Sequence, residues 1–207
     1  MPKARRRRVF HARMLAIRPA RFHHLRMRDP LFPQLLGDHV WRQLPPAVQA
    51  MHGAATYMET QGVADVAGDT HLPARWLRRL LGLPQPGAGQ RLTVTFERQG
   101  TREVWTRCFN HRPMRSVLDC RAGSDLLYER LGPVRLGFAL QPDRDGIAWL
   151  LRSVHVLGVP LPRALHVDVL SRSGMREGRY RFQVDVCLPW VGQLVAYNGW
   201  LEEITRA

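Results

Sequence analysis

The fold is decided by residues 91–109, in the middle of the chain, which read RLTVTFERQGTREVWTRCF. Apolar and polar side chains alternate on either side of Gln99-Gly100, and this period of two is typical of a β-hairpin with one buried face. A turn at these two residues predicts three cross-strand pairs on that face: Phe96 with Glu103, Val94 with Trp105, and Leu92 with Arg107.

The same alternation continues towards the C-terminus, whereas the N-terminal side is largely helical. Helices are expected over residues 29–36, 46–52 and 73–81, where prolines and glycines mark the starts and ends. The order of elements predicts an α+β fold, in which N-terminal helices accompany a curled, mainly antiparallel β-sheet of about eight strands that is half-barrel-like. Sheet interiors of this kind often hold an apolar ligand.

The expected helix over residues 73–81 has an apolar stripe and a basic side. The stripe consists of Trp76, Leu77, Leu80 and Leu81. We expect this stripe to pack against the protein, because an amphipathic helix normally buries its apolar side. The other side is then solvated, and it carries Arg75, Arg78 and Arg79.

The positive charge of the chain is concentrated at its start. The 207 residues contain 31 Lys and Arg against 17 Asp and Glu, a formal charge of +14. Ten of the basic residues and none of the acidic ones lie in residues 1–28, so the rest of the chain carries only +4. We therefore expect residues 1–28 to be a basic, disordered N-terminal extension and residues 29–207 to form a single domain.

Three interpretations of the extension remain open. A basic arm would bind phosphates of nucleic acid or of an anionic membrane. An export signal is disfavoured, because the short apolar run 14–17 lies between arginines. The third interpretation is an extension without a role, with a later natural start at Met14 or Met27.

Several segments, taken together in their order and spacing, resemble a known bacterial family. They are Leu35–Gly37, Leu44–Val48, His52-Gly53, Val94–Arg98, Glu103–Arg107, Leu131–Pro133, Gly158–Pro162, Gly178–Phe182 and Leu188–Leu201. Together they resemble the uncharacterised family called domain of unknown function 4166, over residues 30–201. The resemblance implies that the domain occurs alone or behind a nucleotide-binding, oxidoreductase-like domain, so an NAD(P)-dependent oxidoreductase-like protein is a candidate partner. It brings no activity and no catalytic residues.

Four residues are candidates for a site. Glu103, Trp105 and Arg107 share the apolar face of the hairpin, where charges are costly unless they are paired or face a wet cavity. Either the two charges pair at the rim of the sheet, or they are polar anchors of an apolar pocket. In a pocket Arg107 would hold a carboxylate or phosphate, and Glu103 would act as an acid or base. His52, at the end of an expected helix, either complements the helix dipole or joins the site.

Known catalytic patterns are missing from the sequence. There is no nucleophile elbow, phosphate loop or dinucleotide fingerprint, and no spacing of metal ligands, so no metal or cofactor is predicted. Three cysteines without a C-x-x-C pair, and no apolar run long enough to span a membrane, favour the cytoplasm. The first hypothesis is a module that binds a small apolar or amphipathic molecule. The alternatives are an enzyme or enzyme subunit, and a basic-armed protein on nucleic acid or membrane.

Overall fold

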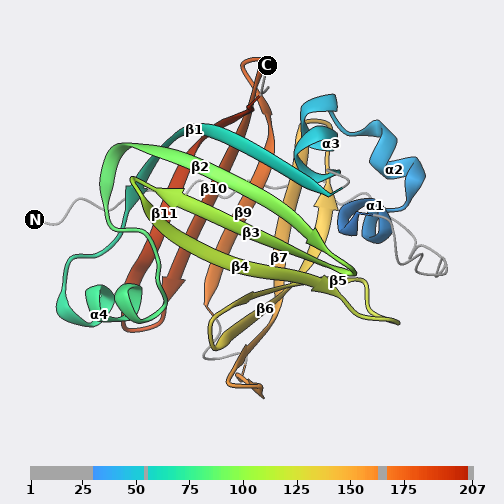
Figure 1. The fold of residues 1–207 in the computed structure, drawn as a ribbon. Helices are drawn as coiled ribbons and strands as arrows, with labels where there is room; N and C mark the ends of the chain where they lie inside the picture. Colours follow the sequence, from blue (N-terminus) through green and yellow to red (C-terminus); the bar gives the residue numbers. More distant parts are fainter. Residues whose placement is uncertain (1–29, 54–55, 163–166, 205–207) are drawn as a thin grey trace, which may run out of the picture.

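The computed structural model describes residues 30–53, 56–162 and 167–204, and an antiparallel β-barrel dominates them (Figure 1). The helices are α1 (Leu31–Leu36), α2 (Asp38–Gln43), α3 (Pro46–His52) and α4 (Leu72–Leu80). The strands are β1 (Tyr57–Ala67), β2 (Gly87–Gln99), β3 (Arg102–Phe109), β4 (Arg112–Cys120), β5 (Leu126–Leu131), β6 (Val134–Pro142), β7 (Gly146–Val156), β8 (Val159–Pro160), β9 (Asp168–Arg176), β10 (Arg179–Leu188) and β11 (Gly192–Glu203). The predicted extension over residues 1–28 lies outside the described residues.

The α+β class and the antiparallel sheet are confirmed, but the prediction of about eight strands in a half-barrel is wrong. The strands follow the order β6-β5-β4-β3-β2-β1-β11-β10-β9-β7, and β6 also pairs with β7, which closes a barrel of ten strands. The short β8 is an additional strand beside β7. Closure follows from strand length and twist: strands of up to 13 residues coil until β6 and β7 meet and pair.

The central hairpin forms as expected, with its turn one residue later than predicted. The turn residues are Gly100 and Thr101, and Gly100 has a φ of 65°, the left-handed conformation that glycine adopts readily. Each predicted partner is therefore displaced by two residues: the observed pairs are Phe96–Trp105, Val94–Arg107 and Leu92–Phe109. Because the side-chain period is two, the predicted face is unchanged.

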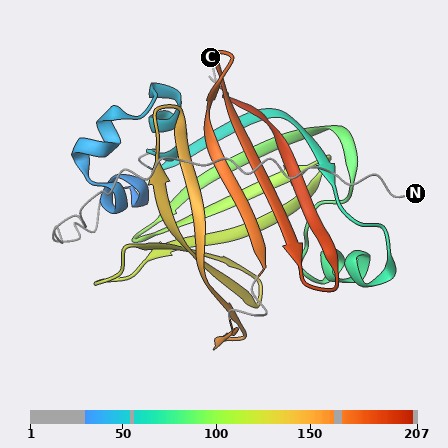
Figure 2. The same cartoon turned by 180° about the vertical axis from the view of Figure 1, so that it is seen from behind.

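The helices lie at opposite ends of the barrel (Figures 1 and 2). At one end α1 to α3 bury Phe32, Val48 and Met51 against the barrel interior, where Phe32 contacts Trp105 and Trp149. At the other end α4 joins β1 to β2 and packs on β11. The barrel thus has a thick aromatic plug at one end and a single short helix at the other.

The predicted orientation of α4 is right for Leu77 and Leu81, which line the barrel interior, but wrong for Trp76, Leu80 and Arg78. Trp76 is 66% and Leu80 is 59% exposed, whereas Arg78, which we expected to be solvated, is only 1% exposed. Arg78 donates hydrogen bonds to the carbonyl oxygens of Leu194 (2.9 Å) and Asp69 (2.7 Å). Leu194 on β11 and Asp69 in the connection from β1 to α4 present these carbonyls below the helix, and a buried carbonyl without a donor is costly. The arginine is therefore turned inward and the apolar ridge outward.

Candidate ligand-binding cavity

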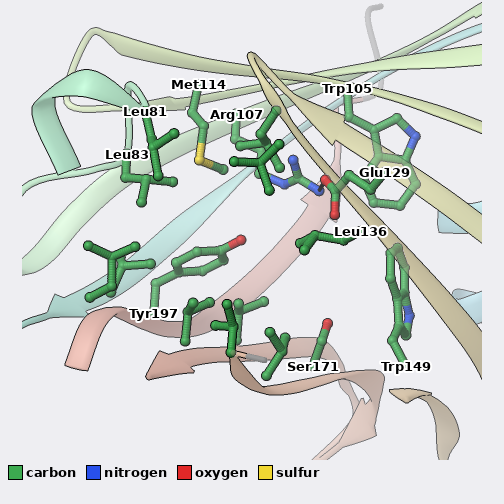
Figure 3. A pocket seen from close by; sticks show the side chains of 18 of the residues that line it. Leu81, Leu83, Trp105, Arg107, Met114, Glu129, Leu136, Trp149, Ser171 and Tyr197 are labelled. Atoms are coloured by element: carbon green, nitrogen blue, oxygen red, sulfur yellow. Dashed lines mark hydrogen bonds and ion pairs between the residues drawn. The ribbon is translucent and has the colours of Figure 1, made fainter. Parts of the chain in front are cut away.

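The barrel encloses a cavity of about 360 Å³ between the α1–α3 end and α4 (Figure 3). Nearly every long strand contributes inward-facing side chains, because alternate residues of each strand point into the barrel. Most of the lining is aliphatic or aromatic; examples are Leu92, Val94, Phe109, Met114, Leu136, Phe138, Val169 and Val184. The inward-facing residues Val169 and Ser171 of β9 and Phe182 and Val184 of β10 are only half-buried, since they border this open space rather than packed side chains.

Arg107 lies in the wall of this cavity and is paired. Its Nη2 atom lies 3.1 Å from a carboxylate oxygen of Glu129 on β5, and its Nη1 atom donates to the hydroxyl of Ser116 on β4 at 2.9 Å. The side chains of Arg107 and Glu129 are 11% and 10% exposed. Burial by itself lowers the pKa of Arg107, but the charge and hydrogen bond of Glu129 together with the neighbouring Tyr197 and Tyr180 outweigh it, so the pKa is raised and the guanidinium stays charged.

Trp105 joins the same wall, as the alternation predicted. The guanidinium of Arg107 lies 5.1 Å from the centre of its indole ring, within the range of a cation–π contact. Trp105 and Arg107 both line the cavity, together with His52. Three of the four candidate residues are therefore in one place.

Glu103 is the exception, because its carboxylate faces α1 rather than the main cavity. One oxygen accepts the backbone N–H of Leu31, the first residue of α1, and the other accepts the indole N–H of Trp105, each at 3.1 Å. Burial raises the pKa of Glu103, and these two donors oppose that rise. Glu103 thus fastens α1 to the barrel and orients Trp105.

His52 closes the cavity from the α3 side and is uncharged. Its Nε2 atom lies 2.9 Å from the hydroxyl of Tyr180 and 3.1 Å from that of Ser173, and its ring packs on Phe32 at 4.2 Å between centres. Burial, together with the charge of Arg107, lowers the pKa of His52 from 6.5 to about 3. The dipole interpretation of His52 as a cation therefore does not hold at neutral pH.

Sequence reasoning missed several polar residues of the cavity. Glu129, Tyr180 and Ser173 line it, and Tyr197 directs its hydroxyl towards Arg107 and Glu129 (Figure 3). For Glu129 a signal existed, since it alternates with Leu127 and Leu131 and so had to share an apolar face. Its partner could not be named, because Arg107 is two strands away and 22 residues earlier.

Within the described residues, the charges of the cavity wall are balanced. Arg107 is compensated by Glu129, and the guanidinium of Arg172 at the edge of the lining binds Asp143 at 2.6 Å. Burial raises the pKa of both Tyr180 and Tyr197, so both hydroxyls remain protonated. The cavity therefore offers hydrogen-bonding groups without net charge.

Trp149 adds a buried indole to the lining. Its Nε1 atom is buried and has no hydrogen-bond partner among the residues that the structure describes. Buried donors are nearly always satisfied in folded proteins, so an unpaired one beside a cavity is a candidate contact for a bound molecule or water.

Comparison with known proteins gives one match. The sequence profile of a family described as "Domain of unknown function (DUF4166)" matches residues 44–201, which confirms the resemblance over this range. Neither the curated proteins nor the solved structures contain a significant match. In the described ranges no helix is both long and apolar enough to cross a membrane.

Proposed function

This chain belongs to the DUF4166 family, and we propose that its barrel is a binding module for an uncharged, largely apolar small molecule with a hydrogen-bonding oxygen. The observation that carries the proposal is the cavity of about 360 Å³, with its apolar lining and balanced charges. Ligand pockets of folded proteins have volumes of about 300–1,000 Å³, and a few polar groups in them fix the orientation of the ligand.

The apolar lining supports an apolar ligand over a polar one. Water molecules form few hydrogen bonds in a space whose wall has few polar groups. An apolar molecule, in contrast, gains van der Waals contacts with the wall and removes its apolar surface from water. The polar groups lie in two places, Arg107 with Glu129 on one wall and His52 with Tyr180 at the α3 side. They suit one or two oxygens on an otherwise apolar skeleton.

The balanced charges support an uncharged ligand. A carboxylate bound beside Arg107 would have to compete with Glu129, which already holds Nη2 at 3.1 Å, and would leave the buried site with a net negative charge. His52 cannot compensate, because its lowered pKa keeps it neutral. An alcohol, ketone or ester needs only hydrogen bonds, and those are present.

Two ligands of equal chain length and different charge test the proposal. The full-length protein is saturated with an uncharged fluorescent apolar probe, and decanol and decanoate are then titrated in at pH 8 as competitors. We expect decanol to displace the probe at concentrations at least about tenfold lower than decanoate. Tighter competition by decanoate would refute the uncharged class.

Substitution of Leu136, which points into the cavity in Figure 3, tests the location. Leu136→Trp fills the space with an indole and should abolish probe binding, while the protein remains folded by circular dichroism. The matched control is Leu170→Trp on β9, because Leu170 is an exposed leucine on a strand of the same barrel. If both variants bind the probe like the wild type, the ligand does not occupy the barrel.

A further inference from the structure

The end of the barrel that carries α4 has an unusual outer surface. Six large apolar side chains there are each more than half exposed: Leu72, Trp76 and Leu80 on α4, Leu157 and Val159 at the β7–β8 turn, and Trp190 at the β10–β11 turn. These connections lie at one end because neighbouring strands run in opposite directions. A hydrogen bond of 2.7 Å from His71 to the carbonyl of Val191 joins the start of α4 to the Trp190 turn. We call this set of six the α4-end patch.

The side chains of α4 and of its C-cap Leu81 point in three directions: against the barrel, into the cavity and out to solvent. Ala74 and Arg78 are buried against the barrel, and Leu77 and Leu81 line the cavity. Leu72, Trp76 and Leu80 follow one another at intervals of four and therefore form one outward ridge. Arg75 and Arg79 are exposed beside this ridge.

Leu80 connects the patch to the cavity. It lines the cavity and is nevertheless 59% exposed, so it lies where the cavity reaches the surface. The opposite end is closed by the aromatic plug of Phe32, His52 and Trp105. A ligand that enters the barrel therefore has its shortest route past α4.

We propose that the α4-end patch docks onto an anionic lipid bilayer and opens the barrel towards it. An exposed apolar ridge flanked by arginines is the pattern of a helix that lies in a membrane interface. The segment 72–83 contains no acidic residue, and its two exposed arginines, Arg75 and Arg79, give the ridge a positive charge that complements anionic headgroups. Tryptophans such as Trp76 and Trp190 are enriched at that depth, since the ring is apolar and its N–H remains hydrated.

The shape of the patch also favours a bilayer over a folded partner. It consists of one helix and two turn tips that project from the barrel end, and Trp190 is held there at a left-handed φ of 61°, which is unusual for a bulky side chain. Projecting apolar tips enter a fluid lipid surface without a complementary pocket. A molecule of low solubility could then pass between bilayer and barrel without crossing water. This inference goes beyond the proposed binding function and is tested separately from it.

Vesicle binding with matched variants tests the proposal. The full-length protein is sedimented with vesicles of phosphatidylcholine alone and of phosphatidylcholine mixed with phosphatidylglycerol. The test variant is Leu72→Ser/Trp76→Ser. The control variant is Leu150→Ser/Leu170→Ser, which removes two exposed leucines that pair across β7 and β9 on the barrel wall. Residues 1–28 are the same in all three proteins, so their own attraction to anionic vesicles cancels in the comparison.

We expect the wild type and the control to bind the mixed vesicles equally, and the test variant to bind them about tenfold more weakly. Brominated phosphatidylcholine in the mixed vesicles should quench the fluorescence of the wild type more than that of Trp76→Phe. Equal vesicle binding by all three proteins would overturn the proposal. The proposal would also be overturned if the wild type used the patch to form a dimer or to bind another protein and did not bind the vesicles. The test variant should still bind the apolar probe, because Leu72 and Trp76 do not line the cavity. A loss of vesicle binding with intact probe binding therefore concerns the patch and not the cavity.

Discussion

Acidification should destabilise this barrel through His52, and the size of the effect follows from the structure. His52 is 3% exposed, its ring is packed on Phe32, and its pKa is lowered to about 3 by burial and by Arg107. In the unfolded chain the same imidazole has a pKa of about 6.5. Between these two values the unfolded state binds a proton that the folded state does not, so stability falls as the pH falls below 6.5.

The expected loss grows by about 1.4 kcal/mol for each pH unit below 6.5. Between pH 7.5 and pH 5 it amounts to about 2 kcal/mol, a large part of the 5–15 kcal/mol that stabilises an ordinary domain. Glu103 works in the opposite direction, because burial raises its pKa and the folded state then binds the extra proton on acidification. The total slope of stability against pH therefore mixes the two groups, and a single curve cannot identify His52.

The variant His52→Gln separates them, since Glu103 is unchanged and glutamine can still hydrogen bond to Tyr180 and Ser173. The free energy of unfolding is measured by urea titration at pH 7.5 and at pH 5 for both proteins. We expect the wild type to lose about 2 kcal/mol more than His52→Gln over this interval. His39→Gln, at an exposed histidine of α2, controls for the loss of an imidazole as such. Equal losses in the wild type and His52→Gln would refute a neutral, buried His52.

Three further substitutions test other contacts by the same urea titration at pH 7.5. Glu129→Gln leaves the buried charge of Arg107 without its partner and should lower the free energy of unfolding by about 3 kcal/mol. The double variant Arg107→Met/Glu129→Leu should recover most of that loss. An unchanged free energy of unfolding in Glu129→Gln would contradict the ion pair. Glu103→Gln keeps only one acceptor for the N–H groups of Leu31 and Trp105 and should cost about 1–3 kcal/mol, and an unchanged unfolding midpoint would argue against this anchor of α1. Arg78→Met leaves the carbonyls of Leu194 and Asp69 without donors and should lower the free energy of unfolding by about 2 kcal/mol. The control Arg79→Met, at an exposed position, should leave it almost unchanged. Equal effects of the two substitutions would show that α4 is not oriented as described.

Most of the strands were predictable from the sequence, but their full number and the closure of the barrel were not. A period of two identifies a strand and its buried face whatever its partner is, and so residues 91–109 placed Trp105 and Arg107 on the inner face correctly. Closure depends on the pairing of β6 with β7, which in turn depends on accumulated twist and on strand length. Neither the accumulated twist nor the final strand length can be read from a local sequence pattern.

The orientation of α4 shows where periodicity misleads. The apolar stripe defines a face of the helix, but the face that packs is decided by the surface underneath. Below α4 that surface presents the carbonyls of Leu194 and Asp69, and a single arginine satisfies both. The prediction for Trp76 therefore assumed that the whole stripe packs, whereas Leu77 and Leu81 reach the barrel interior and Trp76 stays exposed.

The Arg107–Glu129 pair sets the chemistry of the whole cavity. Replacing a buried ion pair by apolar side chains of similar size is often neutral or stabilising, so stability alone gives no reason for such a pair inside a barrel. In this protein the pair places a guanidinium beside the indole of Trp105 and near the hydroxyl of Tyr197 (Figure 3), in a wall that is mostly apolar. The opposite charges of the pair cancel at a distance, while Arg107 still donates a hydrogen bond to the hydroxyl of Ser116 at close range. The selectivity that we propose follows from this arrangement: such a cavity would favour an uncharged oxygen over both a hydrocarbon and an anion, and neither an unpaired arginine nor an all-apolar wall would do both.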